Sequence, residues 1–122
     1  MPRFVVLEHD WNGVHWDLMI EVGTAFRTWR LEAPIVAGAD VPAIRLADHR
    51  LDYWDYEGPV SGDRGTVRRL DRGRHEVREW TADLIRVGLV GAQLVGEAEL
   101  RRKGEIETPP RDRWIFRLAK VE

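Results

Sequence analysis

The stretch Glu8-His9-Asp10-Trp11-Asn12-Gly13-Val14-His15-Trp16-Asp17 brings two imidazoles and three carboxylates together within ten residues. Short apolar runs of strand character flank it, and Asn12-Gly13 is its strongest turn signal. The stretch therefore predicts a β-hairpin that holds polar side chains at its mouth.

The register of this hairpin decides which side chains meet. His15 and Asp17 project from one face of the second strand, because successive strand residues point to opposite faces. If Asn12-Gly13 alone formed the turn, His9 would lie on the other face. A wider loop over residues 10–14 pairs His9 with His15 and gathers all three side chains. We favour this wider loop.

The rest of the chain consists of short apolar segments separated by glycine-containing turns, with no long helical pattern. Such spacing is typical of closed antiparallel barrels. We therefore predict an all-β fold, a compact antiparallel β-barrel with short helical turns, formed by residues 1–122 as a single domain. The predicted strands are residues 4–8, 14–22, 25–31, 43–47, 66–70, 76–82, 84–90, 97–102 and 114–118.

Three segments are predicted to separate those strands, namely residues 32–42, 71–73 and 103–113. The first half of residues 48–59 is compatible with one or two helical turns. The six tryptophans are expected to fill the barrel, and the two that adjoin polar clusters, Trp11 and Trp54, are the ones for which another role is open.

Composition limits the classes of protein. The 122 residues contain no cysteine, which excludes disulfides and thiolate metal sites. No apolar run is long enough for a signal peptide or a membrane span, so we expect a cytoplasmic protein without membrane association. Because the net charge is only −2, the chain as a whole neither attracts nor repels nucleic acid strongly, and binding would need a local positive patch. The six arginines from Arg64 to Arg78 are candidates for such a patch. His75, within that run, is expected at the surface.

Two groups of side chains carry possible chemistry. His9, His15 and Asp17 form a two-histidine, one-carboxylate set that suits Mn²⁺, Fe²⁺ or Zn²⁺, and the alternative is a surface turn with a satisfied histidine. His49 and Tyr53 would share a face at helical spacing and supply a proton donor and a hydroxyl. The alternative for this pair is a structural role in closing the barrel.

These residues lie in two blocks that resemble the signature blocks of the 3′-phosphoesterase domain of bacterial DNA ligase D. The first block contains Glu8-His9-Asp10, His15-Trp16-Asp17 and Ile20-Glu21, and the second runs from Asp48-His49 through Leu51-Asp52-Tyr53 to Asp55-Tyr56-Glu57-Gly58. Further short motifs follow in the family's order, so the resemblance covers most of the chain.

The resemblance implies a β-barrel enzyme that trims 3′ ends of DNA in repair, removing a terminal ribonucleoside and then the 3′-phosphate. It implies that His9, His15 and Asp17 bind a divalent metal, Mn²⁺ in the first place and Zn²⁺ as the alternative. It also implies phosphate contact and proton transfer by His49 with Tyr53. The implied partners are DNA 3′ ends and a separate ligase or polymerase.

The chain departs from the family where phosphate would be bound. Cationic residues expected by the family pattern are replaced by Met19, Ala33 and Val41. Each lost donor would cost about 10² to 10³ in rate unless it is replaced. We expect Arg45 to be the replacement, because strand parity puts it on the face of Val41, and Arg64 is the second candidate.

Two other functions remain open on these residues. The barrel could be a catalytically weak or inactive module that binds nucleic-acid ends or a partner enzyme. It could also be a phosphoesterase that acts on a smaller substrate.

Overall fold

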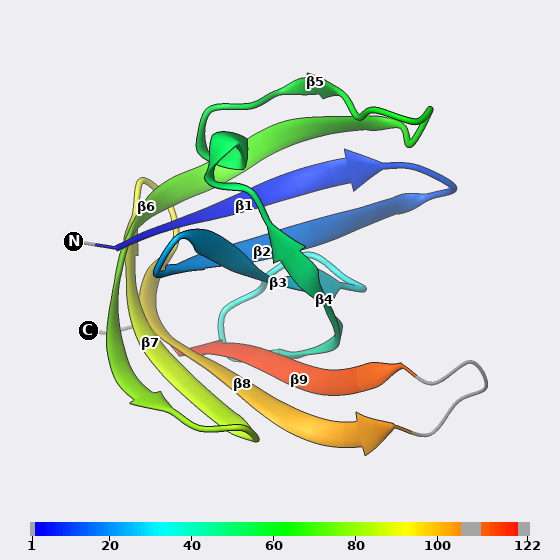
Figure 1. Ribbon diagram of the computed structural model, residues 1–122. Coiled ribbons are helices and arrows are strands. Elements are labelled where there is room, and N and C mark those ends of the chain that lie inside the picture. The colour runs from blue at the N-terminus through cyan, green and yellow to red at the C-terminus, as the bar shows by residue number, and fades with distance from the viewer. Residues whose placement is uncertain (1, 106–110, 120–122) are drawn as a thin grey trace.

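The computed structural model describes residues 2–105 and 111–119, which form strands and one short 3₁₀ helix (Figure 1). The helix, η1 (Leu51–Trp54), is far too short to cross a membrane, and the described residues contain no membrane-spanning helix. The strands are β1 (Arg3–Asp10), β2 (Val14–Val22), β3 (Ala25–Leu31), β4 (Asp40–His49), β5 (Gly58–Pro59), β6 (Thr66–Trp80), β7 (Leu84–Gly91), β8 (Val95–Glu105) and β9 (Asp112–Ala119).

The strands close into an antiparallel barrel, which confirms the predicted fold class. Neighbouring strands follow the order β1-β2-β3-β4-β9-β8-β7-β6, and pairing of β1 with β6 closes the ring. The long strand β6 makes this closure possible, because its first half pairs with β1 and its second half with β7. The two-residue strand β5 pairs only with the start of β6 and lies outside the ring (Figure 1).

The predicted interruption at residues 71–73 is wrong, because β6 runs unbroken through them. The Asp71 carboxylate is buried and accepts hydrogen bonds from the backbone N–H groups of Ala92, Gln93 and Leu94 in the β7–β8 turn. Gly73 lies so close to the opposite strand that an added Cβ would come within 2.0 Å of the Val90 carbonyl oxygen. Asp71 therefore anchors the β7–β8 turn, and Gly73 allows two strands to approach closely. Neither residue forms a turn of its own.

Other predicted boundaries need smaller corrections. β4 begins at Asp40, three residues before the expected start, and so shortens the predicted connection 32–42. β8 continues to Glu105 and β9 begins at Asp112, so the predicted loop 103–113 is shorter than expected. Its central residues 106–110 lie outside the described residues.

Alternating side chains of β1, β2 and β3 form two separate apolar clusters. One fills the barrel interior and draws buried residues from every strand of the ring except β6. From β6, the partly buried Leu70 and Trp80 pack against this cluster. The other lies on the opposite, outer face of the β1–β2–β3 wall, beneath η1 and β5 (Figure 1). It consists of Val5, Leu7, Met19, Phe26, Val60 and Val67, with Leu51, Tyr53 and Trp54 packed against it. This outer cluster holds residues 51–60 against the sheet.

Four of the six tryptophans lie in or against the barrel interior, and the two that do not are Trp11 and Trp54, which adjoin polar clusters in the sequence. Those that line or pack against the barrel interior are Trp16, Trp29, Trp80 and Trp114. Trp54 packs against the outer cluster, where the guanidinium groups of Arg3 and Arg72 lie 5.1 and 4.9 Å from its ring. Trp11 is 41% exposed. Barrel filling is thus confirmed for four tryptophans and is wrong for Trp11 and Trp54.

His75 is buried, which contradicts its expected surface position. It lies opposite Leu89 in the β6–β7 ladder, and Leu89 belongs to the interior cluster. The His75 Nε2–H donates to the Glu21 carbonyl oxygen over 2.8 Å, and burial lowers the pKa of the imidazole. The charged neighbours Arg74 and Glu76 point outward, which is why the sequence around His75 resembles a surface segment.

Candidate active site

The wider hairpin loop predicted from the sequence is confirmed. His9 lies directly opposite His15 in the β1–β2 ladder, and their ring centroids are 4.6 Å apart. Residues 11–13 make the turn, with positive φ angles at Asn12 and Gly13. Asp17 follows His15 by two residues and therefore projects from the same outer face of the wall.

The three side chains form a compact, largely buried group. His9 Nδ1 lies 3.3 Å from Asp17 Oδ2, and His15 Nε2 lies 3.5 Å from Asp17 Oδ1. One potential ligand atom from each residue falls within 4.8 Å of the other two. Imidazole and carboxylate donors gathered in this way are the ligand set that divalent transition metals prefer.

Two details of this group fit a metal ion. The His9 Nε2–H donates to the Arg64 carbonyl oxygen over 2.7 Å, which leaves the Nδ1 lone pair directed at the group. A backbone partner on the far nitrogen is the usual way in which a metal-binding histidine is oriented. Asp17 Oδ1 is buried and has no hydrogen-bond partner among the described residues. A bound cation would satisfy this oxygen.

The surroundings shift the pKa values of the two histidines in opposite directions. A hydrogen bond that the His9 ring donates to the Asp17 carboxylate raises the pKa of His9, against the opposing effect of burial and of the Arg64 charge. Burial lowers the pKa of His15, and the positive charge of Arg30 lowers it further. The nearby Asp17 carboxylate has the opposite effect and raises it. A metal binds the neutral imidazole, so His15 is the better prepared ligand of the two.

A pocket of about 300 Å³ opens in front of these ligands. Its walls come from the β1–β2 hairpin, from β3, from the end of β4, from η1 and from the segment around β5. The lining residues are His9, Trp11, His15, Asp17, Met19, Arg30, Leu46, Ala47, His49, Tyr53, Val60, Arg64 and Val67.

His49 and Tyr53 meet in this pocket, with ring centroids 5.4 Å apart. They do not share a helix face as the spacing predicted, because His49 ends β4 and Tyr53 belongs to η1. The His49 Nδ1–H donates to the Ala47 carbonyl oxygen over 2.9 Å, which places the ring proton on Nδ1 and the lone pair on Nε2. The tyrosine hydroxyl has no hydrogen-bond partner among the described residues.

Arg45 is not brought to this pocket. It lies opposite Trp29 on the interior face of the wall, with its guanidinium carbon 4.6 Å from the centroid of the Trp29 ring. An irregularity in the β3–β4 ladder pairs Thr28 with Leu46 and Phe26 with His49. Two residues on β3 are thus matched by three on β4, and this one extra residue reverses the strand parity, so Arg45 and His49 point to opposite faces.

Two other arginines do line the pocket. Arg64 was predicted, and its Nε–H donates to the Ser61 carbonyl oxygen over 2.7 Å. Arg30 was missed by the sequence reasoning. It lies directly opposite Asp17 in the β2–β3 ladder and on the outer face, because its neighbours Trp29 and Leu31 face the interior. That alternation of apolar residues around Arg30 was the available signal.

The three positions that lack the family's cations have different surroundings. Met19 is buried and lines the pocket, so an apolar side chain lies there together with His9, His15 and Asp17. Val41 is buried in the barrel interior, and Ala33 packs against the interior cluster. Only Met19 therefore lines the pocket itself.

Comparison with known proteins agrees with the geometry. A family model described as DNA Ligase D 3′-phosphoesterase domain matches residues 7–102. The chain is 28% identical over 126 residues to the Multifunctional non-homologous end joining protein LigD of Pseudomonas aeruginosa. That similarity covers 97% of this chain and 15% of the relative, so the chain spans a small part of the relative's length.

Proposed function

The chain belongs to the DNA ligase D 3′-phosphoesterase domain family, and from that membership we propose a divalent-metal-dependent phosphoesterase that processes 3′ ends of DNA in repair. The substrates are 3′-phosphate and 3′-terminal ribonucleoside ends. A separate ligase or polymerase would use the resulting hydroxyl end, and such a bacterial enzyme would act in the cytoplasm.

His9 through Nδ1, His15 through Nε2 and the Asp17 carboxylate would hold the metal, with Mn²⁺ as the first candidate and Zn²⁺ as the second. When bound, the metal supplies a Lewis acid that withdraws charge from a phosphate oxygen. The observation that best supports this assignment is that Asp17 Oδ1 is buried without a hydrogen-bond partner among the described residues. A buried carboxylate oxygen without a partner is costly unless a cation or a donor meets it.

Arg30 and Arg64 are the cations that we assign to the phosphate. Both line the pocket, and Arg30 stands across from Asp17 in the β2–β3 ladder. Their charge would offset the negative charge of the phosphoryl oxygens as the P–O bond to the sugar breaks. Arg30 thus takes the role that strand parity had predicted for Arg45.

We assign proton transfer to His49 and a hydrogen bond to the phosphate to Tyr53. The His49 Nδ1–H is held by the Ala47 carbonyl, so a second proton on Nε2 can pass to the oxygen of the leaving sugar. Water supplies the oxygen that enters the phosphoryl group. The Tyr53 hydroxyl, without a partner among the described residues, is available to donate to a phosphate oxygen.

The experiment measures release of inorganic phosphate from a 3′-phosphorylated DNA primer with Mn²⁺ and with Zn²⁺. We expect turnover that chelator abolishes and that His15→Ala lowers to the background rate. Activity that persists in both His15→Ala and Asp17→Asn would overturn the mechanism.

A second candidate follows from Met19. An apolar side chain that lines the pocket removes a place where a cation would meet the phosphate, which favours a module that binds 3′ ends or a partner without turnover. Tight binding of the 3′-phosphorylated primer with no product under any divalent metal would support this candidate. Turnover of a small phosphomonoester but not of the primer would instead indicate a smaller substrate.

A further inference from the structure

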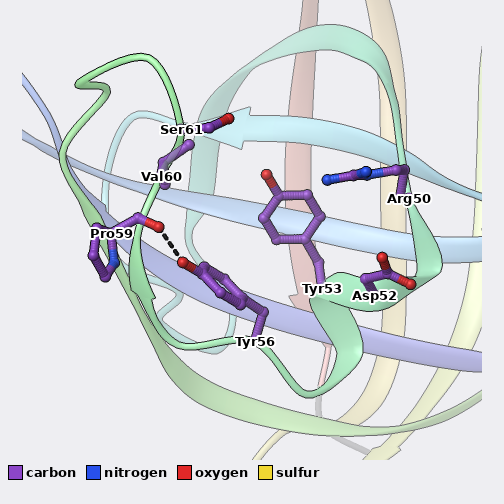
Figure 2. Close-up of a pocket in the computed structure, with 7 residues that line it drawn as sticks. All are labelled: Arg50, Asp52, Tyr53, Tyr56, Pro59, Val60 and Ser61. Carbon is purple, nitrogen blue, oxygen red and sulfur yellow. Dashed lines mark hydrogen bonds between the residues drawn. The ribbon is translucent and has the colours of Figure 1, made fainter.

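A second pocket has a volume of about 270 Å³, and Figure 2 shows the residues that line it. Tyr53 and Val60 line both this pocket and the active-site pocket, so the two spaces are neighbours. The lining residues are Arg50, Asp52, Tyr53, Tyr56, Pro59, Val60 and Ser61. We call this space the side pocket.

Two charged side chains of the side pocket, those of Arg50 and Asp52, make no hydrogen bond or ion pair with the described residues. Arg50 directly follows His49, and its exposed guanidinium makes no hydrogen bond or ion pair with any described residue. The Asp52 carboxylate is also exposed and without such a partner among residues 2–105 and 111–119. Figure 2 shows both side chains beside the Tyr53 ring. They offer hydrogen-bond donors and acceptors side by side.

The aromatic wall of the side pocket is held in place from several sides. The rings of Tyr53 and Tyr56 meet edge to face, with centroids 6.0 Å apart. The Tyr56 hydroxyl donates to the Pro59 carbonyl oxygen (Figure 2). Tyr53 also packs against the outer cluster below the sheet. The wall is therefore preorganised for a flat ligand.

We propose that the side pocket binds the nucleoside whose 3′-phosphate occupies the active-site pocket, with the base against the tyrosine rings. Arg50 would donate to acceptor atoms on the base edge, and Asp52 would accept from its amino or imino groups. Bases present both kinds of group on their edges, and aromatic side chains stack with every base. A second phosphate fits less well, because it would meet the like charge of Asp52. This inference rests on the proposed phosphoesterase function.

The test compares two DNA primers with the same 3′-phosphate. One ends in an ordinary nucleoside and the other in an abasic deoxyribose. For the wild-type protein we expect kcat/KM to be about tenfold higher with the base present. Arg50→Ala should lower kcat/KM for the ordinary primer and leave the abasic primer nearly unchanged, so that the preference for a base largely disappears.

A matched control is Arg86→Ala, because Arg86 lies on β7, away from both pockets, in an exposed ion pair with Glu79. This variant should keep the preference of the wild type. Equal losses on both primers with Arg50→Ala would overturn the proposal and assign Arg50 to a phosphate. An unchanged preference would overturn it as well.

Binding separates this proposal from the proposed function. Fluorescence anisotropy of the same two labelled primers, measured without divalent metal, needs no turnover. We expect weaker binding of the abasic primer, and weaker binding of the ordinary primer to Arg50→Ala. If no primer is hydrolysed but this pattern holds, the phosphoesterase function fails and the nucleoside site stands. Equal binding of both primers would overturn the nucleoside site even if hydrolysis is observed.

Discussion

His9 and His15 face each other directly across the β1–β2 ladder, with ring centroids 4.6 Å apart. This pairing depends on the register of the hairpin, because a slip by one residue would move His15 and Asp17 to the other face of the wall. The loop that carries Arg64 also orients His9, because the Arg64 carbonyl oxygen accepts a hydrogen bond from the far ring nitrogen, Nε2. The proposed metal site is therefore assembled by two strands and one loop.

Removal of a metal ligand should abolish metal binding and leave the barrel folded. We expect His15→Ala and Asp17→Asn to weaken Mn²⁺ binding by more than the roughly 10- to 100-fold that loss of an outer-shell partner costs. Isothermal titration calorimetry with Mn²⁺ measures this, and circular dichroism checks the fold. Asp40→Asn, which affects an exposed ion pair with Arg117, is the control. Unchanged Mn²⁺ affinity in both ligand variants would contradict the assignment.

Arg30→Ala should lower kcat for release of 3′-phosphate by about 10²- to 10³-fold, because a donor to the developing phosphoryl charge is lost. Mn²⁺ affinity should change little, since Arg30 is not a ligand. Steady-state kinetics and calorimetry on the same preparation separate the two effects. Values of kcat and of kcat/KM that both lie within twofold of the wild type would exclude Arg30 from the phosphate site.

Arg45→Ala should lower the stability of the protein and leave its activity unchanged. The Arg45 guanidinium lies over the Trp29 ring, and a contact of this kind contributes about 0.5 to 2 kcal/mol. We expect a lower free energy of unfolding in urea and a kcat close to that of the wild type. A large loss of kcat at unchanged stability would return Arg45 to the phosphate site expected from the sequence.

Asp71→Asn should destabilise the protein by about 2 kcal/mol or more, because the buried carboxylate accepts backbone hydrogen bonds from three residues of the β7–β8 turn. An amide can accept at only one of the two positions. Urea denaturation measures the loss, and the exposed Asp40→Asn provides the comparison, with an expected change within about 0.5 kcal/mol. Similar effects of the two substitutions would show that Asp71 does not hold the turn.

Acidification should destabilise the barrel through His75. Burial holds the pKa of His75 in the folded protein below its unfolded value of about 6.5. The unfolded chain therefore binds more protons as the pH falls through and below that value, and stability decreases. His75→Gln removes the titrating group and keeps a donor for the Glu21 carbonyl.

The measurement for His75 is the free energy of unfolding between about pH 7.5 and about pH 5. We expect a smaller decrease in His75→Gln than in the wild type. The raised pKa of His9 acts in the opposite direction, so the difference between the two proteins, and not either slope alone, is the relevant quantity. Parallel curves would refute the role of His75.

The sequence predicted the elements whose signals are local. The alternation around His15 and Asp17 placed β2 correctly, and the hydrophobic runs located the ring of strands. It failed at residues 71–73, where Asp71 and Gly73 have turn-like chemistry but serve contacts with the distant β7–β8 turn. Long-range partners of this kind leave no trace in a window of neighbouring residues.

The same distinction holds for the candidate site. His9, His15 and Asp17 were recognisable because they lie within one hairpin. Arg45 was misplaced because the irregularity in the β3–β4 ladder, which reverses parity before His49, has no signal in the residues themselves. The proximity of Arg30 to Asp17 depended on the register between two strands, which no single segment specifies.

The two faces of the β1–β2–β3 wall have separate tasks. Side chains that point inward build the barrel interior, and those that point outward either line the pocket or belong to the outer cluster. Outward positions such as Trp11 and Arg30 can therefore be exchanged in a mutant library with little loss of folded protein. The barrel is accordingly a suitable starting scaffold for directed evolution of new 3′-end specificities, because selection at pocket positions outside the outer cluster would act almost independently of selection for folding.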